Sequence, residues 1–593
     1  MASMYFISCS IPHYKQFVAR SRRLDICKPI CLSESTSMAL ATVEPLIRRS
    51  ANYEPSLWSF HHVQSLSSKY TGGDYVARVD TLKLEVKTMI MKSTMAQHPL
   101  SSLELVDNLQ RLGIAYHFED EIRDVLDMIY NNYYKTHDKW NSMDLNLKAL
   151  SFRILRQHGY QLSQEAFFNF KDKIRRMNPC LYKDMVGVLN LYEATYHSFE
   201  DESILDEARD FTAKYLKENQ EKIDGRLSAL VGHALELPLH WRVPRVEAKW
   251  FIGVYEETSG FNPTIVELAK LDFNMVQAVH LEDLKHVSWW WNRINWDKKL
   301  RFARDRLVEN FLWTVGVNYL PQFSLGRRTL AKVNSMVTTI DDIYDVFGTL
   351  NELDQFTNVI SRWDINAAMD ELPDYMKICF LGFYNTVNEI TYNTLTNTGF
   401  LILPYLKKAW ADLCKSYLLE AQWYHAGHTP TLEEYLENAC VSISIPVILT
   451  HVKFLTSVSL TEEILQYKER ADNIVRYSSL IFRLADDLGT SSDEMARGDI
   501  PKSIQCYMHE SGASEDDARM YIKTLIHDTW KKLNKERAGG GADSKFAREF
   551  NECATNLARM AQFMYSEGDG HGRPHVTKSH VLSLLVNPIQ MVK

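Results

Sequence analysis

The sequence lacks the cysteine patterns that would point to a zinc site or a disulfide framework. Its nine cysteines are scattered over 593 residues. They form no Cys-x-x-Cys pair and no cluster with histidine, so neither structural zinc nor a set of disulfides is expected. Reduced thiols within a cell compartment are the default for such a chain.

Long apolar runs, an excess of basic charge and nucleotide-binding loops are also missing. The most apolar stretch, Ala439 to Thr450, is shorter than the roughly 18–20 residues of a membrane span and contains Pro446. A formal net charge of −8 argues against a general nucleic-acid binder. There is no GxGxxG or P-loop, and alternating strand patterns are nearly absent. We therefore expect a helical protein that binds no nucleic acid and spans no membrane.

The first 43 residues differ in composition from the rest of the chain. They contain five lysines and arginines against two acidic residues, together with seven serines. No helical period there is long enough to pack, and no apolar core of a secretory signal follows the basic residues. This composition is typical of an organelle transit peptide, which we place at residues 1–47. A merely disordered tail is the alternative.

Helical periodicity dominates the region from about Ser59 to Glu257. In the stretch Ser101–Gly113, leucine or valine recurs every three residues, Ser101 is a candidate N-cap, and Gly113 is a candidate C-cap. Gly260 and Pro263 then interrupt the pattern. We predict a supporting helical domain at residues 48–260 and a second helical domain at residues 261–593.

Three carboxylates, Asp341, Asp342 and Asp345, lie in the second domain on a stretch with helical spacing of apolar residues. Their separations of three and four residues put them on neighbouring faces of a helix, roughly 5–6 Å apart. No lysine or arginine occurs from residue 333 to 361, so the segment does not neutralise itself. Such hard oxygen ligands suit Mg²⁺ or Mn²⁺. The alternative is a solvated acidic face.

A second acidic stripe supports the metal interpretation. Asp486, Thr490 and Glu494 follow one another at intervals of four residues, which is one side of a helix over about two turns. Two carboxylates and a hydroxyl on one stripe can chelate a hard cation. Two such helices facing each other would hold several divalent ions, which is useful when the substrate is a polyanion such as a diphosphate.

Basic and aromatic residues accompany both stripes. Arg304 and Arg306 precede the first stripe, whereas Arg483 and Lys502 flank the second. Arginine grips phosphate oxygens with two parallel hydrogen bonds, although an Arg–Asp salt-bridge patch would show the same pattern. Trp313 offers an aromatic face that can stabilise a nearby cation, but a core position is the commoner fate of a tryptophan.

One further motif lies just after the predicted transit peptide, where Arg48-Arg49 is followed by eight residues and then Trp58. With Arg304-x-Arg306, Asp341-Asp-x-x-Asp345 and Asp486-Asp-x-x-Thr490-x-x-x-Glu494, in this order, the chain resembles the plant terpene synthase family. Within it, the resemblance is to the angiosperm monoterpene synthases, and it runs from about Arg48 to the end of the chain.

The resemblance implies an all-α fold with an N-terminal relict α-barrel and a C-terminal class I terpenoid synthase bundle. The DxDD motif of protonation-initiated class II cyclases is absent. That branch of the family is usually plastidial, which fits the predicted transit peptide and implies the chloroplast stroma. The substrate implied is geranyl diphosphate, and the protein is expected to be a monomer or a homodimer.

The resemblance also implies roles for individual residues. Three Mg²⁺ ions, or Mn²⁺ as the alternative, would be bound by Asp341, Asp342, Asp345, Asp486, Thr490 and Glu494. The substrate diphosphate would be held by Arg304, Arg306, Arg483 and Lys502, with Asp341, Asp345 and Asp486 acting through the metals. Trp313 and Tyr344 would line the cavity of the carbocation, and its contour would be set by Asn334, Ser335, Thr338 and Ser442. The Arg48-Arg49 pair is similar to the family's N-terminal cap, which is associated with isomerising geranyl diphosphate to a linalyl form.

The product remains open at this point. The basic pair favours a cyclic product, and polar Asn334 and Ser335 allow a water-quenched alcohol or ether as well as an olefin. The alternatives are an acyclic synthase of the linalool, ocimene or myrcene type and a sesquiterpene synthase that uses farnesyl diphosphate. A chain-elongating prenyltransferase usually has two aspartate-only motifs, which Thr490 and Glu494 break. A non-catalytic helical binding protein is the remaining alternative.

Overall fold

The computed structural model describes residues 48–95, 98–168, 184–223, 225–455, 468–498, 500–538, 545–566, 568–571 and 573–591. All regular elements in these ranges are helical, and none is a strand. The predicted all-α fold is therefore confirmed. The predicted transit peptide at residues 1–47 lies outside the described residues. Arg48 to Lys593 form one compact unit.

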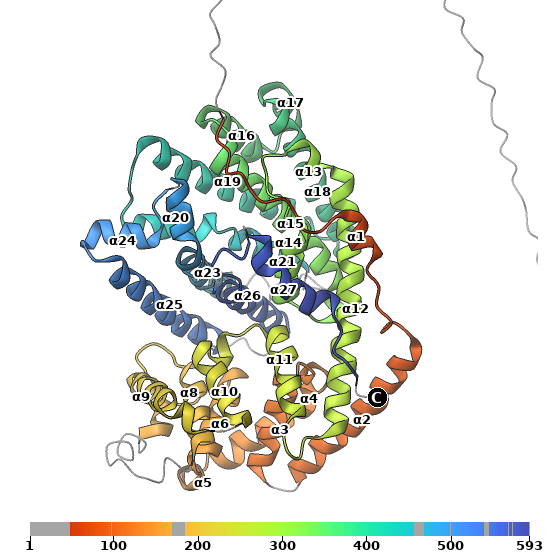
Figure 1. Ribbon diagram of the computed structural model, residues 1–593, viewed down its shortest axis with the longest axis vertical. Helices are drawn as coiled ribbons and strands as arrows, with labels where there is room; N and C mark the ends of the chain where they lie inside the picture. Colours follow the sequence, from red (N-terminus) through yellow and green to blue (C-terminus); the bar gives the residue numbers. More distant parts are fainter. Residues whose placement is uncertain are drawn as a thin grey trace, which may run out of the picture. The chain divides into compact units, whose positions relative to one another are not determined.

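The first half of this unit is built from short helices that pack in sequence. α6 packs on α3 and α8, and α8 packs on α9. The helices of this half, drawn from red to yellow in Figure 1, are α1 (Phe60–Ser65), α2 (Gly73–Met95), α3 (Pro99–Arg111), α4 (Glu119–Ile129), α5 (His137–Ser142), α6 (Leu145–Gln157), α8 (Met185–Thr195), α9 (Ser203–Asn219), α10 (Gly225–Glu236) and α11 (Pro244–Glu256).

Helix α3 shows where sequence periodicity succeeds and where it fails. Its predicted apolar residues are buried, Leu103 completely, and Gly113 beyond its end has a φ of 75°, in the left-handed region that glycine tolerates. The predicted N-cap Ser101 is wrong, because the helix begins at Pro99 and its N-cap position is His98. Proline supplies the φ of a first helical residue without needing a hydrogen bond, so the helix starts two residues earlier.

The second half contains longer helices. They are α12 (Pro263–Ile294), α13 (Trp296–Lys299), α14 (Leu307–Val317), α15 (Ser324–Asp342), α16 (Leu350–Arg362), α17 (Ile365–Glu371), α18 (Asp374–Thr398), α19 (Leu403–Ala426), α20 (Leu432–Ser442), α21 (Ile445–Leu455), α23 (Lys468–Arg497), α24 (Ser503–Ser511), α25 (Glu515–Ala538), α26 (Lys545–Met564) and α27 (Pro574–Val581). Five of them pack in a closed succession, α14 on α15, α15 on α21, α21 on α23, α23 on α26, and α26 on α14 (Figure 1). Because the two acidic motifs lie on α15 and α23, this succession places them around one bundle.

The predicted domain boundary at residue 260 coincides with a helix start. Gly260 has a φ of 82°, and the Asn262 side chain accepts hydrogen bonds from two backbone N–H groups of α12. One connected set of buried apolar side chains nevertheless includes both Leu103 on α3 and Trp313 on α14. The division into domains at residues 48–260 and 261–593 therefore stays a prediction.

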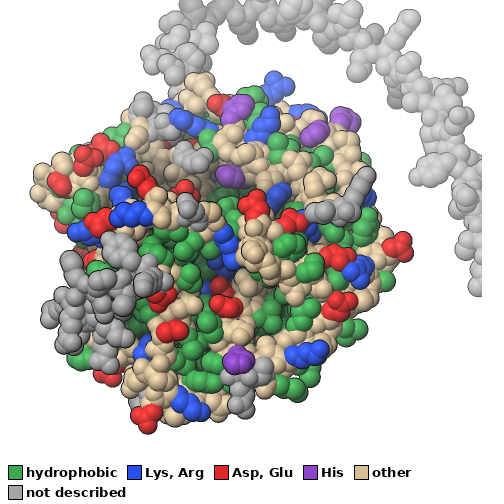
Figure 2. All heavy atoms as spheres, turned by 60° about the horizontal axis from the view of Figure 1, so that its bottom comes forward, with side chains coloured by type: hydrophobic (Ala, Val, Ile, Leu, Met, Phe, Trp, Pro, Cys, Tyr) green, Lys and Arg blue, Asp and Glu red, His purple; other side chains and the backbone are tan. Residues whose placement is uncertain are grey.

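One stretch among the described residues, Leu432–Leu455, is long and apolar enough to cross a membrane by length and composition. It is not one continuous helix, because Ser444, with a φ of 66°, separates α20 from α21. About 61% of its apolar window is buried inside the protein, which is the setting of a core helix pair. On the face shown in Figure 2, acidic and basic side chains are interspersed.

Candidate active site

The first acidic motif straddles a change of helix type. α15 ends at Asp342, and a π-helical turn, η8 (Ile343–Phe347), follows and carries Asp345. The wide turn is closed by a hydrogen bond from the Gly348 N–H to the Ile343 carbonyl, at 2.8 Å. A continuous α-helix was expected here, and the π turn changes the direction in which Asp345 leaves the helix relative to Asp341. Asp345 is exposed, whereas Asp342 is fully buried.

Arg304 lies between the two buried or half-buried carboxylates of this motif. Its Nη2 is 2.5 Å from Oδ2 of Asp341, and its Nε is 2.8 Å from Oδ1 of Asp342. The Arg304 backbone N–H also donates to Asp342 at 2.6 Å. Burial raises the pKa of Asp342 to about 6, against the lowering effect of Arg304. The predicted proximity of Arg304 to the acidic motif is therefore seen in the structure.

The second acidic motif lies entirely on α23, as predicted. Asp486, Thr490 and Glu494 share one side of the helix, and Asp486 and Thr490 are buried. The Thr490 hydroxyl donates to the Asp486 carbonyl at 3.0 Å, which leaves its oxygen lone pairs able to accept a cation. Burial raises the pKa of Asp486 to about 8, and the neighbouring carboxylates Glu494 and Asp487 add to this effect.

Both bases predicted beside this motif pair with its carboxylates. Arg483 Nη1 is 3.0 Å from Asp486 Oδ2, and Lys502 Nζ is 3.6 Å from Glu494 Oε2. Arg483 also donates to the hydroxyl of Ser442 at 3.4 Å, so that predicted contour residue faces the same cluster.

Two carboxylates in this region were missed by the sequence reasoning. Asp487 is fully buried and accepts hydrogen bonds from the Tyr435 hydroxyl, at 3.0 Å, and from the Ser503 N–H, at 3.1 Å. It thus joins α20, α23 and the start of α24. Glu420 on α19 accepts from the Ser442 hydroxyl at 2.5 Å. Glu420 lies outside every motif in the sequence. Asp487 is part of the second acidic motif, but the spacing of the motif gave it no role distinct from that of Asp486.

The donor set fits a hard divalent cation. Within the ranges that the structure describes, no three acidic, histidine or cysteine side chains already converge on one point. The predicted ligands are instead held apart by bases, as in the pairs Arg304–Asp341 and Lys502–Glu494. Burial is the main cause of the raised pKa of Asp486, and the nearby carboxylates Glu494 and Asp487 raise it further, so a cation that displaced the bases would be stabilised there.

The predicted basic pair reaches the first acidic motif. The two guanidinium nitrogens of Arg48 each donate to Glu352 at 2.8 Å, and Nη1 also donates to the Phe347 carbonyl at 2.9 Å. Arg49 donates to the carbonyl of Asp345 at 3.1 Å. Residues 48–58, which we call the strap, therefore begin at the π turn.

The far end of the strap is fixed to α14. The Trp58 indole N–H donates to Glu309 at 3.2 Å, and Glu309 is fully buried. Arg306 donates to the Glu54 carbonyl at 2.8 Å and to the His571 carbonyl at 3.2 Å. These contacts tie the strap and the C-terminal loop together, and contact of Arg306 with a diphosphate stays a prediction.

The predicted cavity residues fall into two groups. Trp313 is nearly buried and stacks on Phe482 with ring centroids 4.9 Å apart, so it belongs to an aromatic wall between α14 and α23. Thr338 lies 3.3 Å from Nε2 of His571. The other predicted side chains have local partners: Tyr344 bonds Thr357, Asn334 bonds the Asn310 carbonyl, and Ser335 bonds the Ala331 carbonyl. Their role as a cavity contour stays a prediction.

His571 is a further residue that sequence reasoning did not single out. It lies in the loop after α26. Burial and the nearby Arg304 and Arg306 hold the pKa of His571 well below its usual value, so the imidazole is neutral. A neutral imidazole beside Thr338 can accept a proton.

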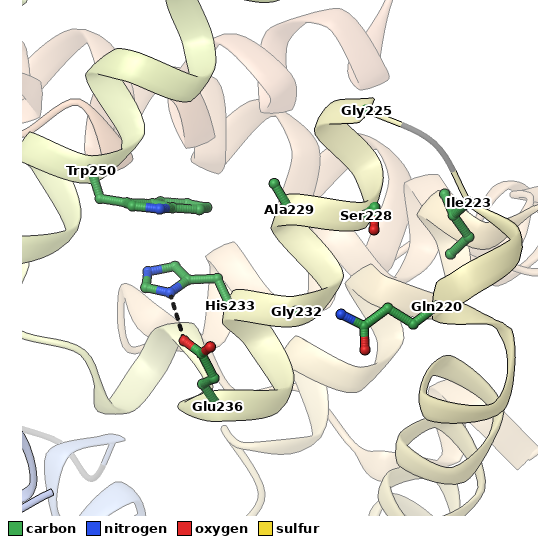
Figure 3. A pocket seen from close by; sticks show the side chains of 9 residues that line it. All are labelled: Gln220, Ile223, Gly225, Ser228, Ala229, Gly232, His233, Glu236 and Trp250. Atoms are coloured by element: carbon green, nitrogen blue, oxygen red, sulfur yellow. Dashed lines mark ion pairs between the residues drawn. The ribbon is translucent and has the colours of Figure 1, made fainter. Parts of the chain in front are cut away.

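A cavity of about 500 Å³ lies elsewhere, between α10 and α11. Figure 3 shows His233 between the Trp250 ring and Glu236, with Gln220 and Ser228 on the other side. None of the predicted site residues lines it, and its walls are mostly polar. The acidic motifs and this cavity are therefore separate features.

Comparisons with known proteins agree with this geometry. Residues 57–235 match the model for "Terpene synthase, N-terminal domain", and residues 292–532 match that for "Terpene synthase family, metal binding domain". The chain is 68% identical over 92% of its length to "R-linalool synthase QH1, chloroplastic" from Artemisia annua, 95% of which is covered.

Two solved structures are similar over nearly the whole chain. A limonene synthase with 2-fluorolinalyl diphosphate has a TM-score of 0.87 and 43% identity, covering 92% of this chain and 100% of that one. Isoprene synthase from Populus x canescens, in complex with three Mg²⁺ ions and dimethylallyl-S-thiolodiphosphate, has a TM-score of 0.81 and 45% identity, covering 90% and 99%.

Proposed function

Because the chain belongs to the terpene synthase family, we propose that it is a plastid monoterpene synthase that ionises geranyl diphosphate and releases diphosphate. The predicted transit peptide at residues 1–47 and the chloroplastic relative support the plastid location. Farnesyl diphosphate is the substrate of the alternative, a sesquiterpene synthase.

The observation that carries this proposal is the pairing of bases with the carboxylates of both acidic motifs. Arg304 holds Asp341, and Arg483 holds Asp486. Lys502 holds Glu494 in the same way. A diphosphate brings negative oxygens for the bases, and divalent cations bring positive charge for the carboxylates, so both sets of charges exchange partners together. Neither ligand alone would satisfy both sets.

The residues that would hold Mg²⁺ are Asp341 and Asp345 on one side and Asp486, Thr490 and Glu494 on the other, with Mn²⁺ as an alternative ion. When bound, the ions act as Lewis acids that stabilise the charge of the leaving diphosphate. The solved isoprene synthase with three Mg²⁺ ions supports the predicted number of three ions. Asp342 was predicted as a further metal ligand. Its two oxygens are in contact with the backbone N–H and the Nε of Arg304, so we assign Asp342 the role of positioning that arginine.

The chain's own residues then handle the allylic cation. Trp313 and Phe482 present stacked aromatic faces near it, which stabilise positive charge and exclude water. Thr338 places a hydroxyl near the neutral imidazole of His571. His571 can take up the proton that a terpene cation loses when it becomes an olefin.

Two kinds of product follow from different observations. The strap and its Arg48-Arg49 pair support a linalyl intermediate and ring closure, as does the limonene synthase that holds a linalyl diphosphate analogue. The likeness to an R-linalool synthase favours an acyclic alcohol formed when water quenches the first cation. The choice depends on whether water reaches the cation before the ring closes.

The test is an incubation with geranyl diphosphate and Mg²⁺, followed by chiral gas chromatography and mass spectrometry. The full chain and a chain starting at Arg48 are assayed side by side, with farnesyl diphosphate in parallel. Monoterpenes from geranyl diphosphate support the proposal and name the product. Turnover of farnesyl diphosphate alone would make the protein a sesquiterpene synthase, and no turnover of either would favour a binding protein.

A further inference from the structure

The strap crosses the first acidic motif because both its ends are fixed to rigid positions. Arg48 binds Glu352, which is itself held as the N3 residue of the capping box that Thr349 opens at the start of α16. Hydrogen bonds from Arg48 and the Thr349 N–H lower the pKa of Glu352 to about 2, although burial acts in the opposite direction. At the other end, Trp58 binds Glu309 on α14. The segment between these anchors has little freedom.

Within the strap, the backbone bends so that one side chain points at the diphosphate arginine. Asn52 has a φ of 50°, a left-handed conformation that asparagine tolerates better than most residues. Its backbone N–H donates to the Ser50 hydroxyl at 3.3 Å, which stabilises the bend. Tyr53 follows directly, and its ring centroid lies 4.9 Å from the guanidinium carbon of Arg304.

The Tyr53 hydroxyl adds a second contact, because its hydrogen bonding lowers the pKa of the Asp342 carboxyl against the effect of burial. Asp342 therefore accepts a hydrogen bond from the Arg304 backbone N–H, forms an ion pair with the Arg304 Nε, and lies under the influence of the Tyr53 hydroxyl. One edge of the Arg304 guanidinium is fixed by Asp342, and one face is covered by the Tyr53 ring. The Nη2 edge, which pairs with Asp341, is the edge left for exchange.

We propose that Tyr53 is a positioning residue that fixes Arg304 for the substrate diphosphate, so that the N-terminal strap sets the geometry of the ionisation site. This inference rests on the proposed function, because it assigns Tyr53 to the same reaction. Because Asp342 fixes the Arg304 guanidinium, this group loses less conformational freedom when it binds phosphate oxygens. Because the Tyr53 ring covers one face, water screens the charge of the guanidinium less. Tyr53 acts through Arg304 and Asp342 and touches no reacting atom.

The variants Tyr53→Phe and Tyr53→Leu separate its two contacts. Tyr53→Phe keeps the ring over Arg304 and removes the hydroxyl, whereas Tyr53→Leu removes both. Loss of a hydrogen bond to a charged group is expected to weaken pyrophosphate binding roughly tenfold, and loss of the cation–π contact a further few-fold. The control is Tyr392→Phe on α18, where a largely exposed tyrosine loses the same hydroxyl.

The primary measurement is calorimetric affinity of the full-length protein for inorganic pyrophosphate in the presence of Mg²⁺, with thermal unfolding of each variant. The steady-state KM and kcat for geranyl diphosphate are measured in parallel. We expect the affinity to fall in the order wild type, Tyr53→Phe, Tyr53→Leu, while Tyr392→Phe matches the wild type. A double variant of Tyr53→Phe with Asp342→Asn should bind no more weakly than Asp342→Asn alone, because both act on Arg304.

Other outcomes would overturn the inference. Equal pyrophosphate affinity in the wild type and Tyr53→Phe would refute positioning by the hydroxyl. A lower unfolding temperature with unchanged affinity would show that Tyr53 only packs the strap. Because pyrophosphate binding is measured apart from turnover, a wild type that binds pyrophosphate but turns over no prenyl diphosphate would instead contradict the proposed function.

Discussion

The pairing of Arg304 with Asp341 leads to a prediction that runs against the usual effect of removing an active-site base. The substitution Arg304→Gln should make the substrate-free protein bind a divalent cation more tightly. In the native chain a cation that approaches Asp341 must displace a guanidinium whose Nη2 lies 2.5 Å from the carboxylate. Once the guanidinium is gone, that carboxylate is free for the metal.

The size of the effect follows from the geometry. Two unit charges about 4 Å apart attract by about 4 kcal/mol at an effective dielectric constant of about 20. The side chains of Arg304 and Asp341 are 14% and 26% exposed. Desolvation and screening at such a site leave a net value of about 1.5 kcal/mol. This free energy corresponds to roughly a tenfold rise in metal affinity.

The assay is titration of the substrate-free protein with Mn²⁺, followed by electron paramagnetic resonance, and with Mg²⁺ by calorimetry. Arg301→Gln is the matched control, because Arg301 carries the same charge three residues away and its side chain donates to the Lys298 carbonyl. Thermal unfolding must show that Arg304→Gln is folded, since Asp342 loses its partner. Pyrophosphate should bind more weakly to this variant. Unchanged or weaker metal binding by folded Arg304→Gln would refute partner exchange.

Three other perturbations test separate parts of the site. Asp341→Ala should lower turnover of geranyl diphosphate by roughly a thousandfold, because the leaving group loses its stabilisation, while circular dichroism shows a folded protein; unchanged turnover would sink the metal assignment. Replacing Arg48 and Arg49 with alanine should suppress cyclic products from geranyl diphosphate but spare those from linalyl diphosphate, and equal loss with both substrates would argue against isomerisation under the strap. Burial raises the pKa of Glu309 to about 7. Between about pH 4.3 and about pH 7 the folded protein therefore keeps a proton that the unfolded chain has lost, and the free energy of unfolding falls as the pH rises, by about 4 kcal/mol at most. Glu309→Gln should therefore flatten the dependence of urea unfolding on pH over this range, and a slope identical to that of the wild type would contradict the assignment.

The fold and the charged motifs could be predicted because their signals are local in the sequence. The apolar spacing around Leu103 indicates a helix without knowledge of its neighbours, and the intervals of four residues from Asp486 to Glu494 place them on one side of a helix. Arg304 was predicted near the first acidic stripe from its residue type and from its place ahead of that stripe in the chain. These features need only periodicity and charge.

The remaining parts depend on contacts between residues that are far apart in the chain. Trp58 and Glu309 are separated by 251 residues, and Arg306 and Glu54 by 252. No spacing rule reveals that Arg306 binds the backbone of the strap. Tyr53 belongs to no motif of charged residues, and its role appears only when Asn52 bends the strap toward Arg304.

The π turn at residues 343–347 has a consequence at the level of the gene. A π turn is an α-helical turn with one extra residue, so the loss of a single codon within it would restore an ordinary α-helix. The flanking helices could keep their packing, because the bundle is held by their own buried side chains. The deletion would nevertheless turn Asp345 relative to Asp341 and shift the carbonyls to which Arg48 and Arg49 donate. A protein with this deletion is therefore expected to fold and yet to lose its turnover of geranyl diphosphate, because its metal ligands no longer line up.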